Sequence, residues 1–249
     1  MLVKWYRNWR RGRILARGAI PDRDWEMLIQ RVPAVARYDS ISRRRLRDLV
    51  VLFLHAKSIE PAGGFALTDD VRRQIALQAC MPILGLGLEW YDGWHSVIVY
   101  PDDFRVRDSY TDDDGIVHEV DEARAGEAWP QGPVVLAWTG SDDDANVVIH
   151  EFAHKLDMVN GVANGMPPLH GDMDRERWTA IFSDAYEDFV ARLEADAELP
   201  FDEYAATDPA EFFAVASEAF LLAPDQVRRA YPGVYTELCA FYRQHPRTG

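Results

Sequence analysis

The sequence predicts an α+β protein: a helical N-terminal part, then a small mixed or antiparallel sheet, then a helical C-terminal half. Two observations predict this order. Apolar residues recur at helical spacing before residue 80 and again after residue 141, whereas short runs rich in β-branched residues lie between 83 and 140. A chain of 249 residues can bury one sizeable core. We therefore expect a single domain over residues 1–249, with 1–80, 83–140 and 141–249 as its parts.

The N-terminal part contains two predicted helices. The first carries apolar residues at positions i, i+3, i+4, i+7 and i+8, which are Leu46, Leu49, Val50, Phe53 and Leu54. A Pro-Ala-Gly-Gly break at 61–64 ends this segment. The second helix begins after Thr68, whose side chain can cap it, and stops before Pro82.

The middle part is predicted to form strands at 96–100 and 134–138, and a Thr-Asp-Asp-Asp-Gly turn at 111–115. Helices return after the capping run Ser-Asp-Asp-Asp at 141–144, and the first of them should end at a left-handed stop near 160–161. A stripe over 178–189 predicts another helix, and Thr-Asp-Pro at 207–209 opens a third. The last is expected over 225–244, with a break at 232–233.

Charge is unevenly distributed along the chain, whose net charge is -14. Residues 1–50 hold 13 Lys and Arg against 5 Asp and Glu, and the remainder holds 14 against 36. A basic head could attract nucleic acid, an anionic membrane or an acidic partner. Its arginines are spread over several segments, however, which favours a solvated helical face that also pairs with the acidic body.

The sequence predicts a cytoplasmic protein without membrane association. Arg-Arg at 10–11 is followed by only three apolar residues before Arg17, so no export signal is expected. The sequence has no run of about 18 apolar residues, so no membrane span is predicted. Cys80 and Cys239 lie far apart and are expected to be buried thiols of a reducing compartment.

Residues 150–154 read His-Glu-Phe-Ala-His, the HExxH pattern of zinc metalloproteases. On a helix, His150 and His154 lie one turn apart on the same face, so both imidazoles can bind one tetrahedral Zn²⁺. Glu151 then lies beside the metal without binding it, where it can act as the general base toward a water. The residues that flank the motif are apolar, which indicates that the helix is buried. This favours a shared metal site over two histidines without a common role. We expect one zinc ion per chain.

One further protein ligand has to be found. The longer pattern HExxHxxGxxH is excluded because Asp157 and Asn160 stand where it needs glycine and histidine. A carboxylate from a later helix is the alternative. The candidates are Glu176, Glu187, Glu211 and Glu218.

The residues alone do not decide among these carboxylates. Glu176 lacks the neighbouring Asn and Asp of a thermolysin-like ligand. Glu211 can also be explained without a metal, because it forms a capping box with Asp208. Glu211 and Glu218 are seven residues apart and share a helix face, so both stay open at this point.

Two blocks of the sequence resemble one known family. The first continues the motif over 155–161 as Lys-Leu-Asp-Met-Val-Asn-Gly, and the second, over 204–215, reads Tyr-Ala-Ala-Thr-Asp-Pro-Ala-Glu-Phe-Phe-Ala-Val. Both are similar to the Mlc titration factor A family, which consists of bacterial zinc peptidases whose catalytic core resembles that of the anthrax toxin lethal factor. The resemblance extends over nearly the whole chain.

The resemblance implies a gluzincin-type site. It assigns the zinc ligands to His150, His154 and Glu211, and the general base to Glu151. It also matches Tyr204 to a tyrosine that donates a hydrogen bond to the oxyanion, since a phenol near the metal can stabilise charge that develops in the tetrahedral intermediate. The family further implies aminopeptidase-like activity and a protein partner, a transcription repressor of the Mlc type.

Three residues near these blocks keep alternative interpretations. With Glu211 as the ligand, Glu218 either orients a ligand histidine or faces solvent. Asp157 either orients a ligand in the same way or is a solvated or lysine-paired carboxylate. His170 could line the cleft, although a loop histidine without a catalytic role is the simpler interpretation.

The leading functional hypothesis is zinc-dependent hydrolysis of peptide bonds in a peptide or protein substrate. The alternative is a regulatory protein that sequesters a transcription factor, with peptidase activity secondary. Direct binding of nucleic acid is not expected, because the sequence shows neither a Cys-rich finger nor a clear recognition helix.

Overall fold

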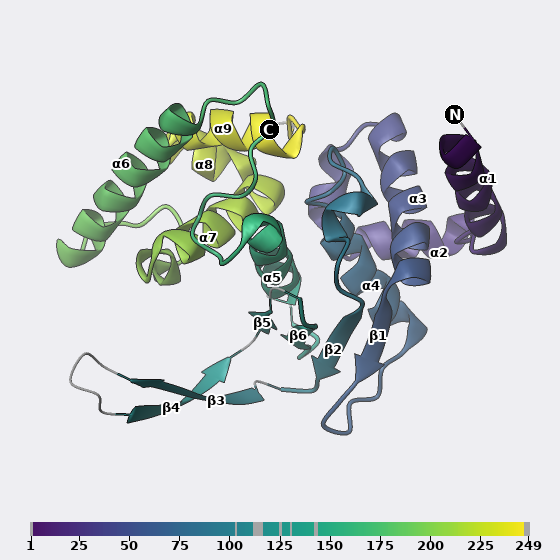
Figure 1. Cartoon of the computed structure of the whole chain (residues 1–249), viewed down its shortest axis with the longest axis horizontal. Coiled ribbons are helices and arrows are strands. Elements are labelled where there is room, and N and C mark those ends of the chain that lie inside the picture. The colour runs from purple at the N-terminus through teal and green to yellow at the C-terminus, as the bar shows by residue number, and fades with distance from the viewer. Residues whose placement is uncertain are drawn as a thin grey trace.

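The computed structural model describes residues 2–102, 104–111, 117–124, 126–129, 131–141 and 144–246. Its N-terminal side is helical (Figure 1). The helices there are α1 (Leu2–Arg17), α2 (Asp22–Gln30), α3 (Ser40–Ala56) and α4 (Asp69–Cys80), with short 3-10 helices at Pro33–Arg37 and Leu88–Tyr91. The N-cap predicted for α4 is present: the Thr68 hydroxyl accepts a hydrogen bond from the Val71 N–H at the start of this helix.

A four-stranded mixed sheet follows. Its strands are β1 (Ser58–Pro61), β2 (Ser96–Tyr100), β6 (Val134–Ala137) and β5 (Gly126–Ala128), in that spatial order. The first three run parallel to one another, and β5 pairs antiparallel with β6. The sheet confirms the α+β class, and it takes β1 from a segment that precedes the region in which strands were predicted.

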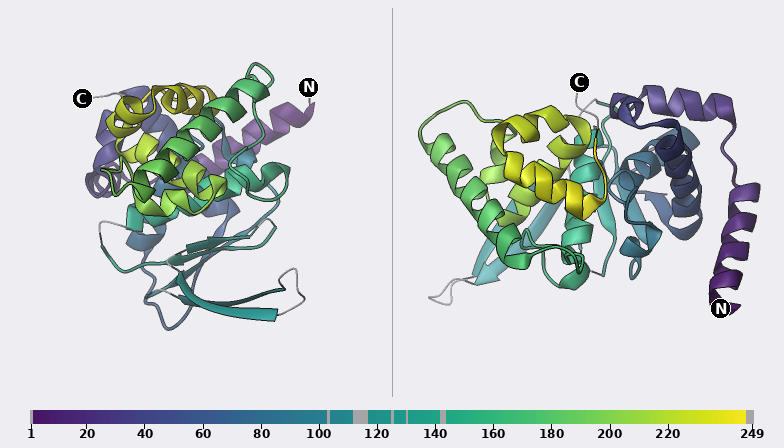
Figure 2. Two further views of the ribbon diagram at one scale, coloured as in Figure 1. Left: turned by 90° about the vertical axis from the view of Figure 1, so that its left-hand side faces the viewer. Right: turned by 90° about the horizontal axis from the view of Figure 1, so that it is seen from above.

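A separate two-stranded antiparallel hairpin, β3 (Phe104–Thr111) and β4 (Val117–Arg124), extends away from the sheet and helices (Figures 1 and 2). The turn predicted at 111–115 lies, beyond Thr111, outside the described residues. The hairpin leads directly toward β5, so the edge strand of the main sheet begins where the hairpin ends.

The C-terminal half is helical, as predicted, and is drawn in green and yellow in Figure 1. It comprises α5 (Asp144–Asp157), α6 (Arg175–Glu194), α7 (Pro209–Leu222), α8 (Pro224–Ala230) and α9 (Pro232–Tyr242). The capping residues expected before α5 include 142 and 143, which lie outside the described residues. A 3-10 turn prolongs α5 to Asn160, and Gly161 ends it with φ 147° and ψ -131°. Only glycine adopts this conformation readily, and it differs from the left-handed helical stop that was predicted.

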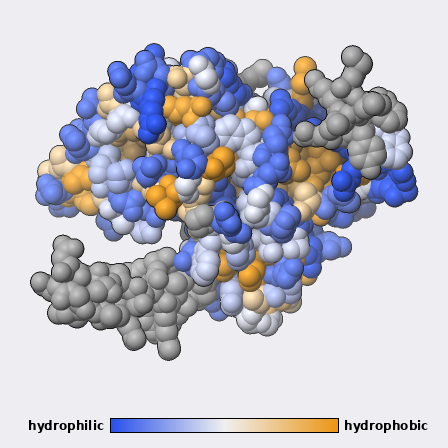
Figure 3. Space-filling model, in the orientation of Figure 1, coloured by the Kyte–Doolittle hydropathy of each residue, from blue (hydrophilic) through white to orange (hydrophobic). Residues whose placement is uncertain are grey.

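Helix α5 lies at the centre of the molecule, in contact with α4 and α7 and with strands β5 and β6. The helical stripes predicted for α3 and α6 belong to the same hydrophobic core; Leu46, Leu49, Val50 and Phe53 are buried, as are Trp178, Phe182 and Phe189. Hydrophilic and hydrophobic residues are interspersed on the face shown in Figure 3. Among the described helices, none combines the length and the hydrophobicity that crossing a bilayer requires.

Candidate metal centre

The HExxH segment is held on α5 by an aromatic cluster. The Phe152 ring lies 5.1 Å from that of Tyr91 and 5.7 Å from those of Phe53 and Trp94, measured between centroids. Residues two positions before and two after a helical residue point to the opposite side of the helix. Burial of Phe152 in this cluster therefore turns His150 and His154 toward α7.

Helix α7 begins where the sequence predicted. The Asp208 carboxylate accepts hydrogen bonds from the backbone N–H groups of Ala210, at 2.7 Å, and Glu211, at 3.0 Å. This confirms the predicted N-cap. The Glu211 side chain, however, reaches the two histidines of α5. Capping alone therefore does not explain where this side chain lies.

Three donor atoms from α5 and α7 converge. One oxygen of Glu211, Oε2, lies 2.9 Å from His150 Nε2 and 3.3 Å from His154 Nε2, and the two Nε2 atoms are 3.0 Å apart. This is the one group of three such side chains, in the part of the chain that the structure describes, whose donor atoms lie close enough to hold a metal ion. Ligands about 2.0–2.1 Å from a tetrahedral zinc ion lie roughly 3.3 Å from one another. Two imidazoles and one carboxylate at these spacings therefore fit zinc.

The far side of His150 faces a carboxylate, and a second carboxylate, that of Asp157, is buried one turn after His154 on α5. His150 Nδ1 lies 2.6 Å from Glu218 Oε1. Of the two interpretations of Glu218, contact with a ligand histidine is therefore the one that the structure shows. On α5, Asp157 is fully buried, and its Oδ2 accepts hydrogen bonds of 2.7 Å from the N–H groups of Asn164 and Gly165. Its Oδ1 and His154 Nδ1 are both buried without a hydrogen-bond partner.

The pKa values in the cluster show how strongly its charges interact. Burial alone would lower the pKa of His150, but hydrogen bonds to Glu211 and Glu218 outweigh it and raise that pKa to about 10. Burial likewise opposes ionisation of Glu211, whose pKa is nevertheless lowered to about 2 by its hydrogen bonds to the two histidines. The protein thus keeps a carboxylate ionised between two imidazoles, a charge distribution that suits a bound cation.

Glu151 is buried and makes a close approach to the sheet. Burial raises the pKa of its carboxyl group to about 7, although the neighbouring His150 and His154 lower it. A Cβ atom at Gly126, the first residue of β5, would lie 2.3 Å from Glu151 Oε1. Only glycine leaves room for the carboxylate there. Nothing in the local sequence marks Gly126, so its role could not be predicted.

Lys155, directly after the motif, connects α5 to the turn between β5 and β6. It is buried, and its Nζ donates hydrogen bonds to the carbonyl groups of Gly132, at 2.9 Å, and Trp129. Its ammonium also lies 4.9 Å from the centre of the Trp94 ring. The same helix therefore holds both the histidines and the strand β5 that passes beside Glu151. This residue, too, was missed, since its role depends on contacts distant in sequence.

Tyr204 lies at the rim of the cluster. It belongs to a short 3-10 helix, Glu203–Ala206, that precedes α7, and its ring centroid is 6.0 Å from that of His150. The side chain is 51% exposed, so it borders both the histidines and solvent. A phenol in this position can reach a ligand that enters the site from solvent.

The remaining candidates lie elsewhere. Glu176 and Glu187 are exposed residues of α6, and neither belongs to the cluster. His170 donates a 2.8 Å hydrogen bond from Nε2 to the Phe241 carbonyl and packs edge-on against Trp90. These contacts give the loop histidine a structural role.

Comparison with known proteins places the chain in a family. Residues 6–243 match the family described as glucose-regulated metallo-peptidase M90. Mlc titration factor A of Cronobacter sakazakii is 37% identical over 252 residues, which cover 98% of this chain and 93% of that protein. Mlc titration factor A of Klebsiella pneumoniae is 39% identical over 230 residues, covering 89% and 86%, and an uncharacterized protein of Synechocystis is 36% identical over 248 residues, covering 96% and 90%. The chain belongs to the M90 metallopeptidase family, which implies a metal.

Proposed function

We propose that this member of the M90 family is a zinc-dependent peptidase in which His150, His154 and Glu211 hold the metal. The observation that carries the proposal is the convergence of these three side chains, with pairwise donor distances of 2.9–3.3 Å, beside the buried carboxylate of Glu151. Zinc held there would lower the pKa of a water molecule and polarise the substrate carbonyl.

Glu151 acts in this proposal as the general base and acid. Its carboxylate accepts a proton from the attacking water and later donates it to the leaving amine. The pKa of about 7 that burial gives it suits both directions of transfer. Tyr204 donates its phenolic proton in a hydrogen bond to the oxyanion as the tetrahedral intermediate forms. Glu218 orients His150 from behind.

The sheet supports a peptide as the substrate. Strand β5 pairs only with β6 in the described sheet, so its other edge can form backbone hydrogen bonds with an extended peptide. Gly126 brings this strand to the Glu151 carboxylate. A substrate backbone that pairs with β5 would therefore run past the proposed base. We further propose an aminopeptidase-like preference, as the family resemblance implies.

The test combines metal analysis with digestion of a peptide library. Wild-type protein should contain about one zinc per chain, lose its activity to a chelator and regain it with zinc. Glu151→Gln should retain zinc and lose activity by a factor of about 10²–10⁴. Cuts one residue from the N-terminus would support the aminopeptidase preference, whereas internal cuts would exclude it without affecting the zinc site. Full activity of Glu151→Gln would refute the role of Glu151.

A second function is favoured by the names of the relatives, several of which are called Mlc titration factor A. Under this alternative the chain is a regulatory protein that binds a transcription repressor of the Mlc type, and hydrolysis is secondary. Glu151→Gln separates the two, because it removes the proposed base and preserves the surface. A variant that still binds the repressor and restores regulation in cells would establish binding as the function.

A further inference from the structure

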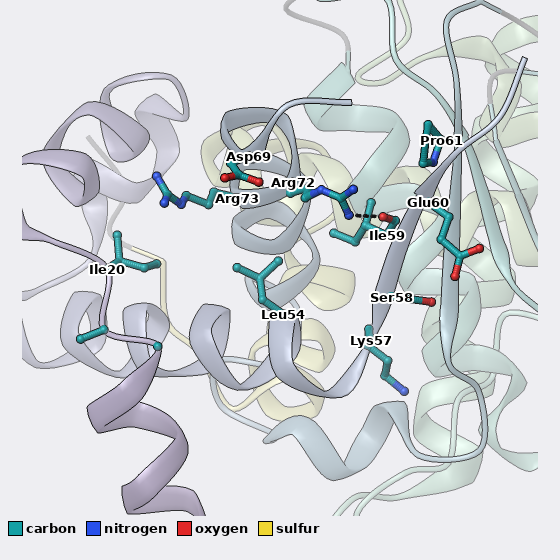
Figure 4. A pocket seen from close by; sticks show the side chains of 12 residues that line it. Ile20, Leu54, Lys57, Ser58, Ile59, Glu60, Pro61, Asp69, Arg72 and Arg73 are labelled. Carbon is teal, nitrogen blue, oxygen red and sulfur yellow. Dashed lines mark hydrogen bonds between the residues drawn. The ribbon is translucent and has the colours of Figure 1, made fainter. Parts of the chain in front are cut away.

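Two hollows lie side by side at the N-terminal helices, far from the proposed zinc site along the chain. They share Gly18 and Leu54, which belong to the walls of both. One, shown in Figure 4, lies next to β1 and α4. The other has a volume of about 620 Å³ and is lined by α1, α3 and Gly18. We call this second hollow the basic groove.

The basic groove combines positive charge with an apolar floor. Its walls carry Arg10, Arg13 and Arg17 on successive turns of α1, all exposed, and no acidic residue is among its lining residues. Ile14 lines it from α1, and Val51 and Leu54 line it from α3. Arginines three and four residues apart share one face of α1, so they form a row beside the apolar strip.

In the described part of the chain, these arginines are not paired with acidic side chains. Within the described residues, none of the three takes part in an ion pair, although seven other arginines do, among them Arg31 and Arg47 nearby. The spread of the arginines along the sequence favours pairing of the basic head with the acidic body. For these three side chains the structure shows no such pairing.

The neighbouring hollow provides an internal comparison. There Arg72 donates to the Ile59 carbonyl, as the dashed line in Figure 4 shows, and Arg73 pairs with Asp24 at 3.2 Å. Its wall also contains Glu60 and Asp69. The arginines of that hollow bind other groups of the protein. The arginines of the basic groove form no ion pair within the described residues, so they can pair with a ligand.

Helix α1 is packed on one side only. Among the described elements, its substantial contacts are with α3, and it lies at the outer side of the molecule in Figure 2. Apolar side chains between two packed helices are a common seat for a third helix. Trp9, 46% exposed at the rim with the Arg13 guanidinium 4.8 Å from its ring centre, is a residue type enriched at binding hot spots.

We propose that the basic groove binds an acidic amphipathic helix of a protein partner. The apolar face of that helix would lie on Ile14, Val51 and Leu54, and its acidic residues would pair with Arg10, Arg13 and Arg17. This proposal is independent of the peptidase function. Charge complementarity selects an acidic partner, and the recessed apolar floor selects a helix over a nucleic acid, whose phosphates would gain nothing from it. A membrane would need apolar side chains that protrude.

The test measures fluorescence anisotropy of a fluorescein-labelled designed helix, with leucine on one face and glutamate elsewhere. The full chain carries Glu151→Gln so that the probe is not hydrolysed. The variant Arg10→Glu, Arg13→Glu, Arg17→Glu should weaken binding by about tenfold or more, because three attractive charges become repulsive. The matched control is Arg11→Glu, Arg44→Glu, Arg45→Glu, three exposed arginines that do not line the groove. It makes the same change in net charge and should bind as wild type does.

Two further probes test the apolar floor and the class of ligand. Replacing the leucines of the designed helix by glutamine should abolish binding, and Trp9→Ala should weaken it severalfold without unfolding α1, as circular dichroism would verify. Equal losses in the groove variant and the matched control would overturn the proposal. So would undiminished binding of the leucine-free peptide, or tighter groove-dependent binding of duplex DNA or of vesicles containing phosphatidylserine.

Discussion

Helices α5 and α7 contribute to the same site in different ways. From α5 come His150, Glu151 and His154, whose geometry follows from five consecutive residues on one helix. From α7 come Glu211 and Glu218, which meet the histidines across 57 and 68 residues of chain. The contribution of α5 can thus be derived from helical periodicity, whereas that of α7 depends on how α6, the 3-10 helix at 203–206 and the aromatic core orient it. The difference separates local from tertiary determinants of one metal centre.

The largest effect is expected from loss of a zinc ligand, and it should be the same for a ligand on α5 and a ligand on α7. His154→Ala on α5 and Glu211→Ala on α7 should each reduce bound zinc well below one per chain and bring peptidase activity to background, because a tetrahedral site needs all three protein ligands. Glu176→Ala, on the exposed side of α6, is the control and should keep both. Retention of zinc by Glu211→Ala together with its loss in Glu218→Ala would reverse the assignment on α7.

The next effect separates the proposed base from the ligands. Gly126→Ala places a methyl group where the Glu151 carboxylate lies and should displace it, since the added Cβ would be 2.3 Å from Oε1. Activity should fall by roughly 10²-fold, the low end of what general-base catalysis contributes, and zinc content should not change. Gly171→Ala is the control, because a Cβ there meets nothing within 4 Å. Wild-type turnover in Gly126→Ala would contradict the position given to Glu151.

A smaller effect compares two buried carboxylates near the histidines, those of Glu218 and Asp157. Glu218→Gln should weaken zinc binding by about 10–100-fold, the usual effect of losing such a partner, and Asp157→Asn should weaken it less, because no hydrogen bond joins Asp157 to His154. Asp157→Asn should in addition lower the free energy of unfolding of the metal-free protein by about 1–3 kcal/mol, because the amide would bury an NH2 donor at the place of Oδ1, which has no hydrogen-bond partner. Chemical denaturation and competition with a zinc chelator measure the two quantities. Identical stabilities of the two variants would remove the structural role of Asp157.

The smallest effect concerns the substrate strand. Lys155→Met removes the hydrogen bonds to Trp129 and Gly132 that hold the β5–β6 turn on α5. We expect a severalfold rise in KM with a smaller change in kcat, since substrate alignment changes and the zinc ligands do not. Steady-state kinetics on one peptide decides this. A fall in kcat at constant KM would show that Lys155 acts on the zinc cluster instead.

Features that depend on local sequence could be predicted, and features that depend on contacts distant in sequence could not. The helical stripe over Leu46–Leu54 and the strand at Ser96–Tyr100 follow from periodicity, and both are present. Strand β1 could not be predicted, because its four residues are stabilised by pairing with β2 and only Ile59 among them is buried. Single short strands carry little local signal.

Within the site, the motif was visible and its surroundings were not. Glu211 and Glu218 share a helix face, so spacing left both open, and the structure places each near a different nitrogen of His150. Family resemblance, which draws on more than one position, favoured Glu211. Gly126 was beyond sequence reasoning, because its importance comes from a carboxylate on another element that approaches its backbone.

The most direct test of the account is a crystal structure of the zinc-loaded protein with anomalous data recorded on both sides of the zinc edge. We predict one anomalous peak between α5 and α7, with His150 Nε2, His154 Nε2 and a Glu211 oxygen at about 2.0–2.2 Å and Glu218 on His150 Nδ1. A peak ligated by Glu218 or Asp157 in place of Glu211, or the absence of zinc from this position in the loaded protein, would contradict it.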